Sequence, residues 1–211
     1  MPPPYSKSVF INCAFDDDFR PIFRAVVFAV LDCGYSPRSA LEEQDGGDIR
    51  ISKIQRLIEG SQLGIHDISR VELDTATGLP RFNMPFELGL FLGAKRYGSG
   101  RDRDKRCLIM DSDPHRYTIF FTDIRGQDPE SHNGEPTRAI AIVRDWLNHG
   151  RRRTLRPLPG GQTIARRYRQ YLDDLPRLAA DVELAPDTLD FRDEAWLMKT
   201  WLQQALPDGN A

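Results

Sequence analysis

The feature that most constrains the fold is a regular alternation of short apolar runs with longer segments of helical periodicity. Four runs predict strands, at residues 7–14, 35–41, 63–69 and 107–110. Three segments between them place apolar residues at helical spacing, at residues 20–33, 49–59 and 81–95. Strands that alternate with helices in this way are typical of βαβ units. The sequence therefore predicts an α/β fold with a mostly parallel sheet and helices on both faces.

The order of the strands follows from the handedness of the connections. Right-handed crossovers leave few topologies, and the simplest is the flavodoxin-like, doubly wound order 2-1-3-4-5. The fifth strand is the least defined, because residues 117–124 fit either a strand or a short helix. Residues 135–149 form an amphipathic pattern that predicts a further helix.

The composition changes after residue 150. A stretch rich in arginine, proline and glycine, at residues 151–161, reads as a linker, and residues 162–178 and 186–206 each predict a helix. This tail is too short for a robust core of its own. We therefore expect an α/β domain at residues 7–150 and a C-terminal helical extension at residues 151–211, packed on that domain or on a second subunit.

Bulk properties exclude several classes of protein. The net charge of −2 over 211 residues argues against a general nucleic-acid binder. The N-terminus lacks a signal-peptide pattern, and the longest apolar run, at residues 25–31, is too short to cross a bilayer. Cys13, Cys33 and Cys107 form no metal-binding pattern and are expected to be reduced core residues, which favours a cytoplasmic protein. We expect no bound metal.

Glu87 is the most informative single residue. It is the only ionisable side chain between Arg81 and Lys95, in a segment that is apolar on every face and therefore predicts a helix buried on several sides. Asn83 is a candidate cap, which would place Glu87 in the first turn. A buried carboxyl needs a partner, a raised pKa or a cavity to face. Two glycines one turn apart, at positions 89 and 93, predict the close approach of another backbone or a ligand.

The predicted topology brings further polar residues to the same place. In a 2-1-3 sheet, ligands bind beyond the carboxyl ends of the first and third strands. The candidate catalytic residues there are Glu87 and Asp67. The candidate substrate-binding residues are Asn12, Phe15, Asp16, Ser69, Asn83 and Met84.

Each candidate also has a structural interpretation. Asp67 is equally suited to capping a loop through backbone N–H groups. For Glu87, complementing a helix dipole is the less favoured interpretation, because the surrounding segment is so uniformly apolar. His66, within a predicted strand, is expected to be a core histidine with its hydrogen bonds satisfied. Signatures of phosphate-binding loops, dinucleotide folds and serine hydrolases do not occur in the chain.

The residues from about 7 to 150 resemble the TIR domain superfamily. The first strand, Val9-Phe10-Ile11-Asn12, precedes an acidic turn, and the loop from Asp45 to Asp48 is similar to the TIR BB loop. Phe86-Glu87-Leu88-Gly89 is similar both to the catalytic helix of NAD-cleaving TIR enzymes and to that of nucleoside 2-deoxyribosyltransferases. Asn83-Met84 stands where catalytic TIR domains often have tryptophan and cysteine, and Phe15 where the transferases have tyrosine.

Both families break an N-glycosidic bond. The resemblance therefore implies an NAD-consuming enzyme in which Glu87 stabilises or captures an oxocarbenium-like sugar. NAD would be the substrate rather than a permanently bound cofactor. It also implies a bacterial defence effector that acts as a homo-oligomer, with the loop at residues 45–48 and a signal or partner protein promoting assembly.

Two alternatives remain open at this point. One is a deoxyribosyltransferase or nucleoside hydrolase, in which Asp67 protonates the leaving base. The other is a catalytically silent nucleotide-binding or scaffold module, in which Glu87 is structural.

Overall fold

In the computed structural model of the protein, residues 3–43, 45–71, 73 and 78–206 are described. One parallel sheet of five strands runs in the order β2-β1-β3-β4-β5, which confirms the predicted flavodoxin-like α/β fold. The strands are β1 (Ser8–Asn12), β2 (Ser36–Ser39), β3 (Leu63–Asp67), β4 (Arg106–Asp111) and β5 (Glu130–Ser131).

The two central strands carry the candidate site. All residues of β1 and β3 are buried, as expected for strands covered on both faces. Their register pairs Val9 with Leu63 and Asn12 with His66, so both strands end at the same level. Side chains alternate between the two faces of the sheet. Val9 and Ile11 join one core, whereas Phe10 joins the other.

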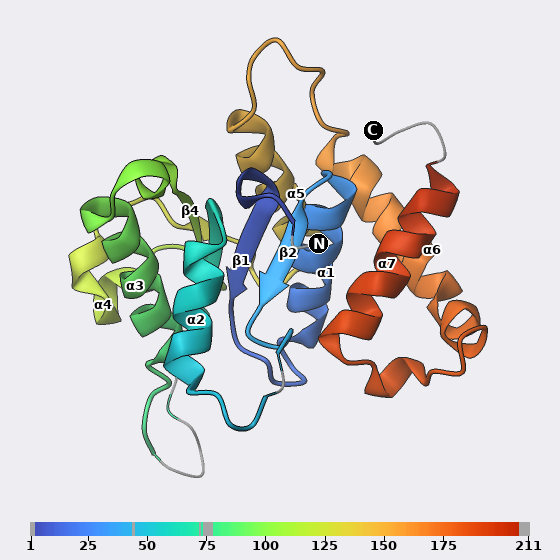
Figure 1. Cartoon of the computed structure of the whole chain (residues 1–211), viewed down its shortest axis with the longest axis horizontal. Helices are drawn as coiled ribbons and strands as arrows, with labels where there is room; N and C mark the ends of the chain where they lie inside the picture. The colour runs from blue at the N-terminus through green and yellow to red at the C-terminus, as the bar shows by residue number, and fades with distance from the viewer. Residues whose placement is uncertain (1–2, 44, 72, 74–77, 207–211) are drawn as a thin grey trace.

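Helices cover both faces of the sheet (Figure 1). One side holds α2 (Arg50–Glu59), α3 (Asn83–Tyr97) and the short α4 (Tyr117–Phe120), and the other holds α1 (Arg20–Asp32) and α5 (Pro136–His149). The C-terminal helices α6 (Gly161–Ala180) and α7 (Phe191–Ala205) add a layer beyond α1 and α5. Their positions agree with the C-terminal helical extension that the sequence predicts.

The extension shares its core with the α/β body. The fully buried Phe28 ring of α1 lies within 5.3 to 6.0 Å of the rings of Tyr168, Tyr171 and Trp201, measured between centroids. On the same helix, the buried Asp32 accepts a hydrogen bond of 3.0 Å from Arg167 of α6. The extension therefore covers apolar surface that α1 would otherwise expose to water.

Two expectations about α3 are wrong. Its buried side chains are confined to one side (Met84, Glu87, Leu88 and Phe91), while Phe86 is 56% exposed. The helix covers one face of the sheet only, and apolar composition did not reveal that its outer face has no covering layer. In the described part of the chain, a Cβ at Gly89 or Gly93 would meet no atom within 4 Å, so the expected close approach of another backbone does not occur there.

The region after β4 also settles an open question. Residues 117–124 form α4 and a 3₁₀ turn (Thr122–Ile124), not a strand. The fifth strand comes later and has only two residues, Glu130 and Ser131, paired with the end of β4. A strand this short carries no periodic pattern, so the sequence does not indicate it.

Candidate functional site

Asn12 joins three elements at the carboxyl ends of β1 and β3. Its side chain is buried, and its Nδ2 donates to the Met84 carbonyl of α3 at 2.9 Å and lies 3.0 Å from His66 Nδ1 of β3. The amide has two N–H groups, so it serves both acceptors, and His66 Nδ1 accepts. The Asn12 side chain therefore fixes the start of α3 relative to the sheet.

His66 is buried as expected, but it is not fully satisfied. Because Nδ1 accepts from Asn12, the ring proton lies on Nε2, which has no hydrogen-bond partner among the described residues. The rings of Phe10 and Phe91 lie 5.8 and 5.0 Å away, and they offer no acceptor. Burial lowers the pKa of His66 to about 3, so the imidazole is neutral at physiological pH.

Glu87 lies one turn into α3, not in its first turn. The helix begins at Asn83, with Phe82 rather than Asn83 at the N-cap. The carboxyl group is therefore beyond the N–H groups with which a helix dipole acts most strongly. Glu87 is 7% exposed, and burial raises the pKa of its carboxyl to about 7. Arg50, on α2, opposes this shift weakly, from 4.0 Å and with a largely exposed side chain.

Three candidate acids gather around the end of β1. Burial raises the pKa of the Cys13 thiol well above its usual value, and the charges of Asp67, Glu87 and Asp16 raise it further. These three carboxyl groups therefore lie near enough to the Cys13 thiol to influence its pKa. The surroundings of the individual carboxylates differ widely.

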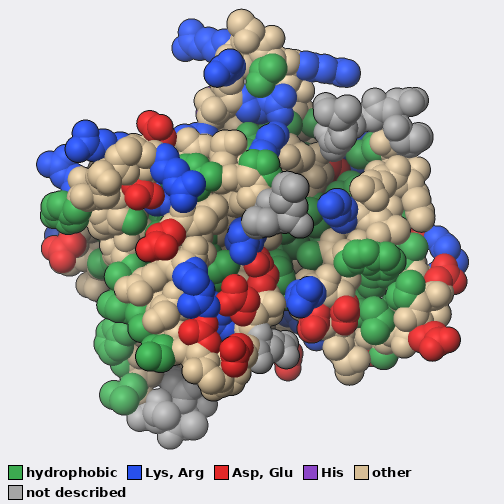
Figure 2. All heavy atoms as spheres, in the orientation of Figure 1, with side chains coloured by type: hydrophobic (Ala, Val, Ile, Leu, Met, Phe, Trp, Pro, Cys, Tyr) green, Lys and Arg blue, Asp and Glu red, His purple; other side chains and the backbone are tan. Residues whose placement is uncertain are grey.

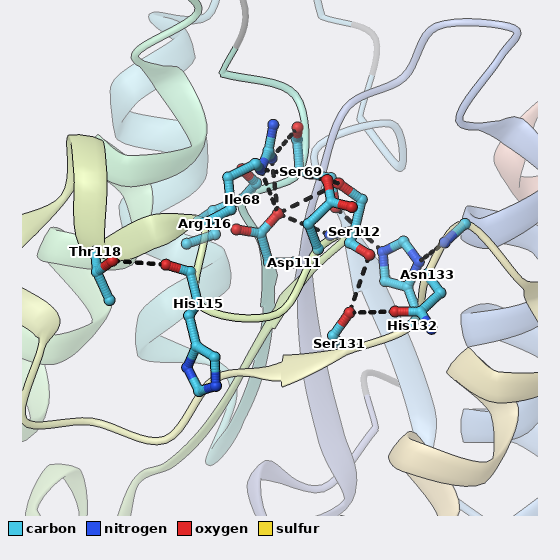
Figure 3. A network of polar contacts seen from close by, with 12 residues as sticks. Ile68, Ser69, Asp111, Ser112, His115, Arg116, Thr118, Ser131, His132 and Asn133 are labelled. Atoms are coloured by element: carbon cyan, nitrogen blue, oxygen red, sulfur yellow. Dashed lines mark hydrogen bonds and ion pairs between the residues drawn. The ribbon is translucent and has the colours of Figure 1, made fainter.

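Asp67 is held by two internal partners. Its Oδ1 accepts the backbone N–H of Ser69 at 2.9 Å, and its Oδ2 lies 3.0 Å from His132 Nε2. The Ser69 hydroxyl lies 3.1 Å from the same nitrogen, and all three side chains are buried. Figure 3 shows Ser69 and His132 approaching from β3 and from the segment that follows β5.

This serine, histidine and aspartate do not form a nucleophilic triad. His132 Nδ1 accepts the backbone N–H of Gly134 at 3.0 Å, so the proton of the neutral ring is on Nε2. A general base for Ser69 would need an unprotonated nitrogen toward the hydroxyl, with the aspartate on the other nitrogen. Here both contacts fall on the protonated nitrogen, so the cluster is suited to holding the strand ends together.

A second buried acid lies at the end of β4. Asp111 Oδ1 accepts from Arg116 Nη2 at 2.7 Å and from the Ser112 N–H at 2.7 Å (Figure 3). Arg116 also donates to the carbonyls of Ile68 and Ser69. Burial raises the pKa of Asp111, and Arg116 counteracts that shift. Arg116 therefore ties the end of β3 to the end of β4.

The sequence reasoning missed this part of the rim. Asp111 ends a strand just as Asp67 does, so the rule for strand ends would have found it. His132 follows a two-residue strand and Arg116 precedes a four-residue helix. Neither has a recognisable sequence signal.

The remaining candidates face outward. Asn83 is exposed at the start of α3. Asp16 accepts from Arg70 at 2.9 Å and from Arg81 at 2.8 Å. Partial burial raises the pKa of Asp16, but these arginines and the Phe19 N–H lower it by more. Asp16 thus connects the turn after β1 with residues on both sides of the segment after β3.

The loop compared with the TIR BB loop is tied to α2. Asp48 pairs with Arg56, which also pairs with Glu43 at 2.9 Å. Gly47 donates its N–H to Asp45 Oδ1 at 2.9 Å. Gln44, within the acidic stretch before this loop, lies outside the described residues.

Neither a metal centre nor a membrane span occurs among the described residues. No group of three or more His, Cys, Asp or Glu side chains in this part of the chain is arranged to hold a metal ion. None of the described helices is long and apolar enough to cross a membrane. Comparisons with known protein families, with characterised proteins and with solved structures found no match to this chain.

Proposed function

We propose that this protein cleaves the N-glycosidic bond between nicotinamide and ribose in NAD, with Glu87 as the catalytic carboxylate. The observation that carries the proposal is the environment of Glu87, which is 7% exposed and has its pKa raised to about 7, and whose ion-pair partner among the described residues is a largely exposed arginine 4.0 Å away. A carboxylate that its own protein stabilises poorly is well suited to stabilising a positive charge that forms beside it during a reaction. Oxocarbenium-like sugars carry such a charge, and a low local dielectric strengthens the attraction.

The surroundings of Asp67 favour NAD over a nucleoside as the substrate. Nicotinamide leaves a cationic pyridinium as a neutral molecule, so its departure needs no proton. A purine or pyrimidine leaves well only when a second group protonates it. Asp67 was the candidate for that role, but both of its oxygens are engaged and the side chain is buried. A single available carboxylate therefore suits NAD.

The proposed reaction depends on the protonation state of Glu87. Glu87 must be ionised to stabilise or capture the sugar cation, and a bound pyridinium favours ionisation because opposite charges attract. The proposal covers both hydrolysis and cyclisation, since they share this first step and differ in the group that attacks the sugar afterwards.

NAD consumption by the purified protein tests the proposal. We expect Glu87→Gln to lower the rate at least about 10³-fold, roughly 4 kcal/mol of barrier, because the variant keeps the shape and loses the charge. Glu59→Gln, at an exposed position at the end of α2, is the matched control and should retain full activity. Undiminished turnover by Glu87→Gln would remove this residue from the mechanism.

Cleavage of nucleosides or transfer of deoxyribose is the second candidate. The observation in its favour is the same raised pKa, because a carboxyl that titrates near 7 is partly protonated at neutral pH and can itself protonate a leaving base. The two candidates predict opposite pH dependence. NAD cleavage should rise as pH increases through about 7, whereas nucleoside cleavage by protonated Glu87 should fall over the same interval.

We further infer that activity depends on self-association in the cytoplasm, as part of a defence response, on the basis of the resemblance to TIR domains. Activity should then increase when the protein is fused to an oligomerising domain, and substitutions in the loop at residues 45–48 should reduce that increase. Binding of NAD without turnover in either state would instead indicate a silent binding module, which calorimetry would detect.

A further inference from the structure

A cleft lies where the C-terminal extension meets the end of β1. It has a volume of about 250 Å³. Ala14 to Asp17 form one wall, the start of α1 forms the floor, and residues 189–194 at the start of α7 form the other wall. Figure 1 shows that α7 begins near the edge at which β1 and β2 end. The cleft therefore opens on the same edge of the sheet as Glu87.

Aromatic rings dominate its apolar surface. Phe15 and Phe23 meet edge to face with centroids 5.5 Å apart, and Phe23 lies 5.8 Å from Phe191 of α7. Phe23 and Phe191 are buried, whereas Phe15 is 38% exposed. A flat ligand entering the cleft would meet the exposed Phe15 ring, and stacking on such a ring stabilises nucleobases whatever their identity.

The charges of the lining select against phosphate. Four lining residues are carboxylates, and Arg20 is the single cation among the lining residues. Arg20 already donates to the carbonyls of Asp187 at 3.0 Å and Leu189 at 3.2 Å. Figure 2 shows acidic and basic side chains mixed over the edge where β1 and β2 end, so the acidic character is confined to the lining of the cleft. Such a lining suits a neutral ring that carries N–H donors.

Asp190 offers an acceptor for those donors. One of its oxygens, Oδ1, caps α7 by accepting the Asp193 N–H at 2.8 Å. Its other oxygen accepts no hydrogen bond from the described residues and could accept one from the amino group of a base, and the exposed Asp17 also lines the cleft. The volume of about 250 Å³ is slightly below the range for whole drug-sized ligands, about 300–1,000 Å³, and fits one base with its sugar.

One wall of the cleft follows closely in sequence on Asn12, which holds the start of the helix that carries Glu87. Asn12, which contacts α3, and Phe15 are three residues apart, so their Cα atoms are separated by at most about 11 Å. Asp16, which follows Phe15 and lines the cleft, pairs with Arg70 and Arg81, so two cations are held next to the cleft wall. A dinucleotide has the matching order of parts: a reacting riboside, a central pyrophosphate and a second nucleoside.

We propose that this cleft binds the adenosine half of the dinucleotide substrate, with Phe15 stacking on the adenine ring. The inference rests on the proposed function for its substrate, but it concerns a separate set of residues. It gives the C-terminal extension a role in substrate selection, because Leu189, Asp190 and Phe191 build one wall of the cleft.

Direct binding of adenosine and of AMP, measured by calorimetry or by NMR titration, tests the cleft without any turnover. We expect both ligands to bind the full-length protein, and Phe15→Ala to weaken binding about tenfold, as expected for the loss of one base–aromatic stack. Phe15→Tyr keeps the ring and should bind as the unmodified protein does. Trp196→Ala removes an exposed aromatic of α7 that does not line the cleft, and it should have no effect.

Kinetics with two substrates separates this inference from the proposed function. Nicotinamide mononucleotide contains the scissile bond and lacks the adenosine half. Phe15→Ala should raise KM about tenfold more for NAD than for the mononucleotide, whereas Trp196→Ala, at a residue that does not line the cleft, should leave the constants for both substrates unchanged.

The possible results distinguish adenosine binding in the cleft from the proposed cleavage of NAD. Adenosine binding that depends on Phe15, in a protein that does not cleave NAD, would support the cleft and refute the proposed function. Turnover of NAD with equal effects of Phe15→Ala on both substrates would overturn the cleft and leave the proposed function standing. Absence of adenosine binding to the unmodified protein, or binding insensitive to Phe15→Ala, would also overturn it.

Discussion

Glu87 and Asp67 are both buried carboxyl groups, and their neighbours give them different properties. Asp67 accepts from a backbone N–H and lies against a protonated imidazole nitrogen, so both of its oxygens have partners within the protein. Among the described residues, the ion-pair partner of Glu87 is the largely exposed Arg50 at 4.0 Å, and the pKa of Glu87 rises to about 7 because burial penalises the ionised form.

The raised pKa of Glu87 predicts a cost in stability. The unfolded chain ionises this group near its ordinary pKa of 4.5, whereas the folded protein holds the proton until about 7. The folded state therefore loses stability relative to the unfolded state as pH rises from 4.5 to 7, by up to about 3 kcal/mol. We expect Glu87→Gln to be more stable than the unmodified protein at pH 8, with a much smaller difference at pH 4.5. Urea denaturation at both values measures this, and equal differences would contradict it.

The hydroxyl of Ser69 is predicted to take no part in the reaction. Because His132 presents a protonated nitrogen to its hydroxyl, Ser69 is not activated as a nucleophile. Ser69→Ala should therefore retain NAD-cleaving activity to within about tenfold, whereas removal of a true serine nucleophile costs on the order of 10⁶ in kcat. Initial rates of NAD cleavage by Ser69→Ala and by the unmodified protein test this prediction. A loss comparable with that of Glu87→Gln would show that the hydroxyl takes part in the reaction.

At the scale of elements, α3 carries the candidate residue Glu87 on its inner side and is exposed on its outer side. Its inner side packs Leu88 and Phe91 against the sheet, and Asn12 holds its first turn through the Met84 carbonyl. Its outer side leaves Phe86 exposed and Gly89 open. The apolar residues of this helix are therefore divided between the core and the surface, which periodicity alone did not separate.

Two glycines in adjacent elements should respond oppositely to alanine. Gly89 lies in α3 with open space around it, so Gly89→Ala should stabilise the fold by up to about 1 kcal/mol through helix propensity. Gly64 lies in β3, where a Cβ would come within 2.8 Å of the Phe91 ring and of His66. Gly64→Ala should therefore destabilise by about 1–3 kcal/mol through overpacking. Thermal unfolding measures both, and a stabilising Gly64→Ala would contradict the packing described here.

At the scale of the whole molecule, the C-terminal extension is continuous with the main core. Phe28 of α1 packs against rings from both α6 and α7, and Arg24 of α1 pairs with the buried Glu194 of α7. Arg20 and Arg24 also donate to backbone carbonyls between residues 186 and 189. Apolar and polar contacts together fix the extension beside the end of β1, where it closes the cleft.

The ion pair between Asp32 and Arg167 tests how firmly the extension is bound. Burial raises the pKa of Asp32, and Arg167 counteracts this shift. Arg167→Leu should cost about 3–5 kcal/mol at pH 7, because a buried carboxylate loses its partner. The cost should shrink as pH falls below the ordinary pKa of aspartate, where Asp32 becomes protonated in both the folded and the unfolded state. Denaturation of Arg167→Leu and of the double variant Asp32→Leu/Arg167→Leu measures this. If Asp32→Leu/Arg167→Leu were no more stable than Arg167→Leu, the loss in the single variant would not come from an unpaired Asp32 carboxylate.

The sequence alone determined the fold class and the order of the strands. Buried parallel strands and amphipathic helices leave periodic patterns that can be read without contacts, and right-handed crossovers restrict how they connect. Glu87 was recognisable for a similar reason, because a lone charge in an apolar segment contradicts its surroundings. These are local properties of the chain.

Tertiary structure decided what surrounds each acid and where the extension lies. His132 and Arg116 reach the site from elements too short to carry a pattern, and they determine the state of Asp67 and the link between the ends of β3 and β4. The outer face of α3 and the wall that Asp190 and Phe191 add to the cleft depend on which elements lie together. Hydrogen bonds and burial join residues that are distant along the chain. For that reason the sequence identified Glu87, and only the fold distinguished it from Asp67.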